Sequence, residues 1–66
     1  QARGKGYGRS MIMQALHDMR REGARKVVLD AREENKRARA LYESVGFKEQ
    51  YVWHGFVRYE VDVTGL

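Results

Sequence analysis

The sequence predicts a small α/β protein of the mixed α+β kind, with the element order loop–helix–strand–helix–strand–strand. Apolar residues recur at helical spacing in two separate segments. A short continuous apolar run lies between these segments, and the C-terminal segment alternates apolar and polar residues with a period of two. Together these three patterns predict two helices and three strands.

Length and composition limit the chain to one small domain over residues 1–66. Of its 66 residues 42% are hydrophobic and 33% charged, with no Cys and no Pro. A chain of this size buries only about 60% of its unfolded surface, so one core is the most it can build. Without Cys, and with only His17 and His54, we expect no metal site. No apolar run approaches the ~20 residues of a membrane span, and we expect a cytoplasmic location.

The first helix is expected to follow a glycine-rich loop at residues 3–8. Three glycines in five residues weaken any regular element. From Arg9 to Glu22 the spacing is helical, and Gly23 is expected to end the helix. Its apolar stripe consists of Met11, Ile12, Ala15, Leu16 and Met19.

The first strand is expected at residues 26–31, with the sequence KVVLDA. Val27, Val28 and Leu29 are adjacent, and continuous apolarity is typical of a strand covered on both faces. We therefore expect this strand to lie in a parallel sheet.

The second helix is predicted by an apolar stripe at i, i+3, i+4 and i+7. Asn35 is a good N-cap before it, and Gly46 is expected to end it, with Phe47 folding back as its apolar partner. The stripe consists of Ala38, Leu41, Tyr42 and Val45.

The last two strands are expected at residues 51–53 and 57–63, joined by a turn at His54-Gly55. In the second of them, alternation places four apolar side chains on one face: Val57, Tyr59, Val61 and Val63. The opposite face of that strand carries Arg58, Glu60 and Asp62.

Positive charge is concentrated beside the glycine-rich loop. Residues 1–26 contain seven Lys/Arg and two Asp/Glu, whereas residues 27–66 contain six and seven. Glycines let the backbone approach a ligand closely, and the free amides of a first helical turn bind anions. We therefore predict a phosphate site here, the alternative being a flexible linker with incidental basic residues. The chain has no Gly-Lys-Ser/Thr of a P-loop, and Arg9 or Met11 occupies the third glycine position of a Rossmann G-x-G-x-x-G motif.

Two motifs resemble those of the GCN5-related N-acetyltransferases. The sequence RGKGYGR at residues 3–9 is similar to the R/Q-x-x-G-x-G/A signature of that family. The pattern N-x-x-A-x-x-L-Y-E-x-x-G-F at residues 35–47 resembles the family's later motif nearly position for position. A strand-like segment separates the two motifs, as in the family, and the resemblance covers residues 1 to about 48.

The resemblance implies transfer of an acetyl group from acetyl-CoA to an amine acceptor, either a small molecule or a protein. It implies that the glycine-rich loop holds the CoA pyrophosphate, that Asn35 reaches the CoA arm, and that Tyr42 protonates the departing thiolate. A phenol with a pKa of about 10 can donate a proton to a thiolate whose thiol has a pKa of about 8.5. The cofactor-binding residues implied in this way are Arg3, Gly4, Lys5, Gly6, Tyr7, Gly8, Arg9, Ser10 and Asn35.

Simpler roles stay open for several of these residues. Asn35 could serve only as an N-cap, and Tyr42 could belong only to the core. Asp30 is expected to be structural and His17 to lie at the surface, while His54 is a minor candidate for a base.

Two further sets of residues also have alternative roles. Tyr51 and Trp53 are expected in the core or in the wall of an acceptor pocket. Three basic residues of the second helix are expected to face solvent, the alternative being a contact with the CoA 3′-phosphate: Lys36, Arg37 and Arg39.

The resemblance also implies a partial acyl-CoA N-acyltransferase fold. The family fold has further elements before the glycine-rich loop, so we expect the chain to lack the N-terminal half of the fold and to be inactive alone. Two other functions compete: a basic nucleic-acid-binding module, and a non-catalytic fragment that self-associates through an exposed sheet edge. Against nucleic acid, the aromatic residues fall at predicted core positions.

Overall fold

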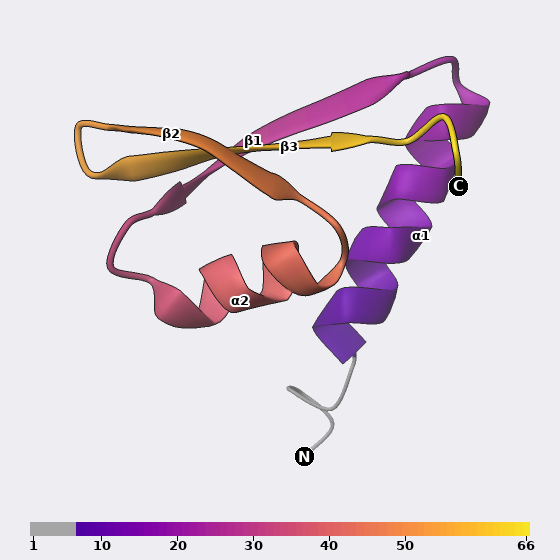
Figure 1. Ribbon diagram of the computed structural model, residues 1–66. Helices are drawn as coiled ribbons and strands as arrows, with labels where there is room; N and C mark the ends of the chain where they lie inside the picture. The colour runs from indigo at the N-terminus through magenta and orange to yellow at the C-terminus, as the bar shows by residue number, and fades with distance from the viewer. Residues whose placement is uncertain (1–6) are drawn as a thin grey trace.

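The computed structural model describes residues 7–66, and for Tyr7 the backbone alone. Two helices cover one side of a three-stranded sheet (Figure 1). Neither described helix is long and apolar enough to cross a membrane. The predicted order and the α+β class are confirmed, with the elements α1 (Tyr7–Arg21), β1 (Lys26–Arg32), α2 (Lys36–Ser44), β2 (Lys48–Trp53) and β3 (Phe56–Asp62).

The sheet has the order β1-β3-β2, and both pairings are antiparallel. In β1 burial alternates, so Val27 and Leu29 pack against the core while Val28 between them is 45% exposed. The prediction of a parallel strand covered on both faces is therefore wrong for the described residues. The physical reason is that α1 and α2 lie on the same side of the sheet, which leaves the outer face of β1 in solvent (Figure 1).

The core is centred on β3, as its alternation predicts. Val57, Tyr59 and Val63 are fully buried, and Val61 packs beside them. β2 begins at Lys48, three residues earlier than expected, and contains a bulge between Glu49 and Tyr51. Because a bulge interrupts the period of two, the alternation of the sequence does not reveal the first half of this strand.

Helix α1 begins at Tyr7 rather than at Arg9, so Gly8 is helical and not part of a loop. Leu16 is the buried centre of its inner face, and Met13 packs against the core although it lies outside the predicted stripe. Met11 and Met19 are exposed, which corrects the prediction for both. Met11 lies five residues from Leu16, which places it on the far side of a helix with 3.6 residues per turn.

Both helices end as predicted, at glycines with positive φ: 104° at Gly23 and 111° at Gly46. After α2, the Gly46 N–H donates to the Glu43 carbonyl (3.2 Å) and the Phe47 N–H to the Tyr42 carbonyl (3.0 Å). This is the Schellman pattern, which needs a left-handed residue at the glycine position. Phe47 is buried directly after it and so anchors the end of the helix that carries Tyr42.

Candidate functional site

The first turn of α1 is the described part of the predicted phosphate site. Arg9 and Ser10 are exposed there, and no acidic residue lies in this turn. A Cβ built on Gly8 would lie 3.4 Å from Leu41 Cδ2, so the start of α1 rests on α2. The unpaired amides of a helix start, next to an arginine, can hold an anion. The predicted binding residues Arg3, Gly4, Lys5 and Gly6 lie outside the described residues, as does the side chain of Tyr7.

Asn35 is the N-cap of α2, as predicted. Its Oδ1 accepts a hydrogen bond of 3.1 Å from the Ala38 N–H. Among the described residues its side-chain nitrogen has no hydrogen-bond partner, and the side chain is exposed. Asn35 can therefore cap the helix and still offer two N–H donors to a ligand.

Tyr42 lies two turns further along α2 and is half-buried. Its ring packs edge-on against Phe47, at 5.8 Å between ring centroids, and tilted against Tyr59 at 6.0 Å. The core role left open for Tyr42 is thus present. Within residues 8–66 its hydroxyl makes no hydrogen bond, so the same residue can also present an O–H group to a ligand.

The structure brings together only part of the predicted site. Leu41 contacts the start of α1 and is the neighbour of Tyr42, so the candidate phosphate turn and the candidate proton donor lie on adjoining helices. Asn35 is the N-cap of α2 and so lies at the end of the helix opposite to Tyr42. A ligand that reached all three would have to be extended along α2.

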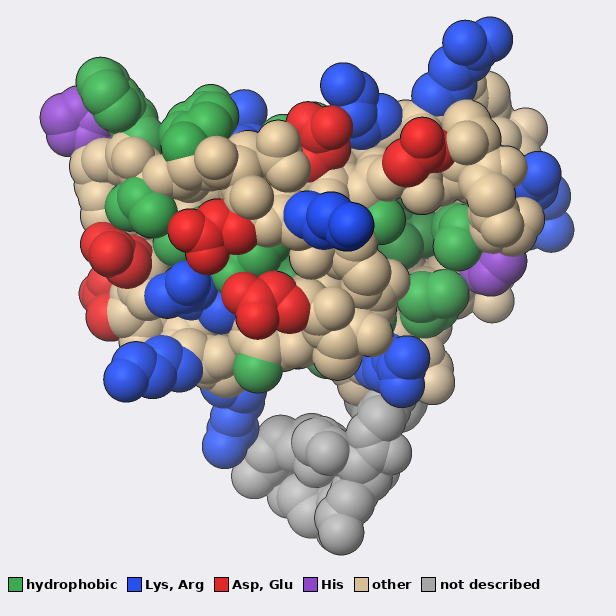
Figure 2. Space-filling view, in the orientation of Figure 1, with side chains coloured by type: hydrophobic (Ala, Val, Ile, Leu, Met, Phe, Trp, Pro, Cys, Tyr) green, Lys and Arg blue, Asp and Glu red, His purple; other side chains and the backbone are tan. Residues whose placement is uncertain are grey.

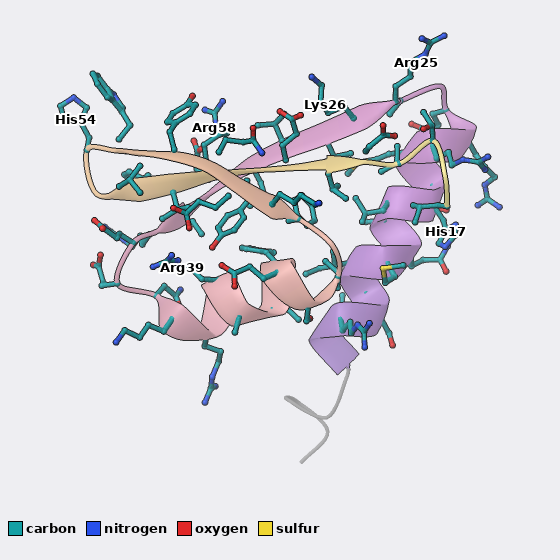
Figure 3. The ribbon with its side chains drawn as sticks, in the orientation of Figure 1. His17, Arg25, Lys26, Arg39, His54 and Arg58 are labelled. Carbon is teal, nitrogen blue, oxygen red and sulfur yellow. The ribbon has the colours of Figure 1, made fainter. Side chains whose placement is uncertain are left out.

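A polar network that the sequence did not reveal holds α2 to the sheet. Arg39 Nε donates to the Tyr59 hydroxyl (3.1 Å), which in turn donates to Glu43 Oε2 (2.7 Å). Figure 3 shows Arg39 between α2 and the sheet, which corrects the expectation that its side chain faces solvent. Burial raises the pKa of the Tyr59 hydroxyl above its ordinary value, the bond from Arg39 opposes this rise, and the bond to Glu43 adds to it.

Two signals in the sequence could have indicated this network. Arg39 and Glu43 are four residues apart and so lie on one face of a helix. Tyr59 was predicted to be buried, and a buried tyrosine hydroxyl normally has a hydrogen-bond partner.

The outer face of the sheet carries a second feature, next to the β2–β3 hairpin. His54 and Gly55 form its two-residue turn with φ values of 52° and 81°, as a type I′ turn requires. Hydrophobic side chains gather beside His54 at this end of the molecule (Figures 2 and 3). A hollow of about 330 Å³ is lined there by Asp30, Tyr51, Trp53, His54, Phe56 and Arg58.

This outer face excludes the core, which was one of the two positions expected for Tyr51 and Trp53. Tyr51 is 52% exposed and Trp53 67% exposed, so neither belongs to the core, although both line the hollow. The argument against nucleic-acid binding, that the aromatic residues fall at core positions, therefore does not apply to Tyr51, Trp53 and Phe56. The Asp30 carboxylate, for which we expected a structural role, pairs with Arg58 on the neighbouring strand.

The Asp30–Arg58 pair is expected to make the stability of the fold depend on acid pH. The hydrogen bond from Arg58 lowers the pKa of Asp30 below its ordinary value of 3.8. A lowered pKa in the folded state contributes stability above the unfolded pKa, and this contribution is lost as pH falls through the folded pKa. Melting temperatures between about pH 6 and pH 2 should therefore fall more steeply for the wild type than for Asp30→Asn.

The matched control for this measurement is Glu22→Gln, which removes an exposed carboxylate that has no ion pair among the described residues. It should leave the wild-type slope unchanged. If Asp30→Asn and the wild type lose stability in parallel, the pair with Arg58 does not contribute to the fold.

Comparisons with known proteins agree with the two motifs. The sequence profile of the Acetyltransferase (GNAT) family matches residues 1–47. The mycothiol acetyltransferase of Corynebacterium glutamicum (strain R) is 47% identical over 45 residues, which are 68% of this chain and 15% of that protein. The mycothiol acetyltransferase of Beutenbergia cavernae is 48% identical over 46 residues, 70% of this chain and 16% of that protein. No solved structure matches the chain significantly.

The chain therefore spans about one sixth of the length of these curated relatives. The family match covers more than half of the chain, and it includes both the glycine-rich signature and the whole segment from Asn35 to Phe47. On this evidence the chain belongs to the GNAT family of acetyltransferases.

Proposed function

We propose that the protein is an acetyl-CoA-dependent N-acetyltransferase, in which this chain binds acetyl-CoA and donates a proton to the leaving thiolate. The observation that carries the proposal is Tyr42, whose ring is packed in place while its hydroxyl has no partner among residues 8–66. The adjoining first turn of α1 supports it, because a helix start with Arg9 suits the phosphates of CoA.

Acetyl-CoA would supply an acetyl thioester, whose carbonyl carbon the acceptor amine attacks before the carbon–sulfur bond breaks. The amides of the first turn of α1 and the Arg9 guanidinium would hold the pyrophosphate, and the side-chain amide of Asn35 would donate to the CoA arm. Tyr42 would give its hydroxyl proton to the sulfur as it departs, so that a neutral thiol leaves. The proton lost by the amine would pass to solvent, and the Tyr42 phenolate would take a proton back from solvent before the next turnover.

The acceptor in this proposal is an amine and no more specific than that. The curated relatives are named mycothiol acetyltransferases, but the chain matches only about one sixth of their length. The proposal also places the protein in the cytoplasm, and the cysteine-free composition is its support, since disulfides are common in oxidising compartments.

Binding to a nucleic acid is less well supported, although three aromatic side chains are exposed on one sheet face. That face also carries Asp30, Glu60 and Asp62, of which Asp30 pairs with Arg58 and Glu60 with Lys26. A polyanion favours a surface with an excess of unpaired cations. Tight RNA binding that weakens steeply with salt, without any response to CoA, would support this second function instead.

The experiment that tests the proposal is a calorimetric titration of the whole protein with acetyl-CoA, with Gly8→Ala as the variant. The added Cβ would lie at an ordinary contact distance of 3.4 Å from Leu41 Cδ2, and alanine favours a helix more than glycine does. The melting temperature should therefore not fall. Acetyl-CoA affinity should fall about ten-fold, a change of about 1.4 kcal/mol, because a glycine without a Cβ is what lets this part of the backbone approach the pyrophosphate closely.

Gly65→Ala is the matched control, since a Cβ on Gly65 would meet no described atom within 4 Å. It should bind acetyl-CoA like the wild type. Equal affinity in Gly8→Ala would remove the start of α1 from the site. If the wild-type protein did not bind acetyl-CoA at all, the proposed function itself would be wrong.

A further inference from the structure

The hydroxyl group of Tyr59 in the sheet bonds two side chains of α2 that lie one helical turn apart. Tyr59, fully buried in β3, accepts a hydrogen bond from Arg39 Nε and donates one to Glu43 Oε2. Arg39 and Glu43 are separated by four residues, so their side chains leave α2 on the same face. Rotation or sliding of α2 along the sheet would break at least one of these two bonds.

Arg39 extends this attachment to two further segments. Its Nη1 donates to the Glu33 carbonyl (3.1 Å), in the loop before α2, and its Nη2 donates to Glu49 Oε1 (3.2 Å) on β2. The side chain is only 27% exposed, and a partly buried polar network is stronger than the same bonds in water. The Arg39 guanidinium, labelled in Figure 3, thus connects α2 with the preceding loop, with β2 and with β3.

Apolar burial alone holds α2 weakly, because none of its residues is fully buried. Tyr42 lies between Arg39 and Glu43 in this helix, and its ring packs against the ring of Tyr59 at 6.0 Å. Tyr59, whose hydroxyl takes part in the network, is therefore also the residue against whose ring Tyr42 packs. A displacement of about 1 Å in a reacting group can cost roughly 100-fold in rate, so such an attachment bears directly on catalysis.

We propose that Tyr59 and Arg39 are positioning residues, which fix α2 against the sheet so that the Tyr42 hydroxyl meets the leaving sulfur. This inference rests on the proposed function of Tyr42 as proton donor. Neither residue touches the substrate in this role, and both act through Tyr42. Their loss should therefore change turnover more than acetyl-CoA affinity.

The test is a double-mutant cycle between Tyr59→Phe and Tyr42→Phe in the whole protein. Release of the CoA thiol from saturating acetyl-CoA is measured with a simple primary amine, butylamine, as the probe acceptor. Tyr59→Phe keeps the ring under Tyr42 and removes only the hydroxyl, so kcat should fall about ten-fold with the Kd of acetyl-CoA within about two-fold. In the Tyr42→Phe background the same change should lower kcat less than about two-fold, since residues that act as a unit are not additive.

Two further variants keep the result interpretable if Tyr59→Phe folds poorly. Arg39→Lys retains the charge but loses the planar fork that reaches three partners, and it should show the same fall in kcat and the same lack of additivity with Tyr42→Phe. Ser44→Ala removes a hydroxyl from the same helix that, within residues 8–66, bonds only the Leu41 carbonyl, and it should leave kcat unchanged.

The outcomes separate this inference from the proposed function. If Tyr42→Phe lowers kcat while Tyr59→Phe and Arg39→Lys do not, or if their effects multiply with that of Tyr42→Phe, the positioning role is wrong and the proposed function stands. If Tyr42→Phe leaves kcat unchanged, Tyr42 is not the proton donor, and the positioning role is overturned with it.

Discussion

Replacing Tyr42 by Phe is expected to lower kcat for acetyl transfer roughly 100-fold, the usual contribution of a positioned general acid. The aromatic ring would remain, with its contacts to Phe47 and Tyr59, so the fold and the melting temperature should change little. Only the proton for the departing thiolate would be lost. Steady-state rates of thiol release at saturating acetyl-CoA measure the effect, and calorimetric titration measures affinity, which should stay within about two-fold.

Ser44→Ala again provides the control within α2, because this side chain is exposed and its hydroxyl bonds to the helix backbone. Full turnover in Tyr42→Phe would leave Tyr42 as a core residue alone, the simpler role that its half-buried ring also fits. A parallel fall in affinity and turnover would instead assign Tyr42 to acetyl-CoA binding rather than to proton transfer.

Replacing Phe47 by Ala is expected to reduce the free energy of unfolding by about 3–5 kcal/mol. Phe47 is 3% exposed, and its ring packs against Tyr42, so the substitution leaves a cavity that few neighbours can fill. Small domains are stable by only about 5–15 kcal/mol, so this loss is a large fraction of the total stability. Urea or guanidinium denaturation of the wild type and the variant measures the difference.

Phe56→Ala is the matched control for Phe47→Ala, because it removes the same ring from the exposed outer face of the sheet. It should cost about 1 kcal/mol or less, including the contact between Phe56 and Arg32. Equal losses for the two variants would mean that the core is not organised around the end of α2.

The sequence predicted helix ends and turns correctly, because a few neighbouring residues determine the backbone conformation there. Asn35 caps α2 because its short side chain reaches an amide three residues ahead. Gly46 ends the same helix because its φ of 111° is strained for residues with a Cβ. The turn at His54-Gly55 lies where it was predicted because Gly55 also adopts a positive φ, of 81°.

The sequence was insufficient to predict how strands far apart in the chain pair with one another. The apolar run around Val28 does not reveal whether one or two layers cover the strand, so the predicted parallel strand became an antiparallel one with an open face. The bulge before Tyr51 hid the first half of β2 for a related reason, since it depends on the partner strand.

By itself the sequence determined the order of the elements, the ends of α2, and the family, through motifs in which Gly8, Asn35 and Tyr42 stand at defined spacings. Only the tertiary structure decided that Arg39 is partly buried, since its partner Tyr59 lies 20 residues away. Helix caps, turns and motif spacings depend on residues a few positions apart, whose contacts the backbone geometry already imposes. Contacts between α2 and β3 depend on how the whole chain packs. Burying a polar group costs free energy unless its hydrogen-bond partner is buried beside it, and here that partner lies far away in the sequence.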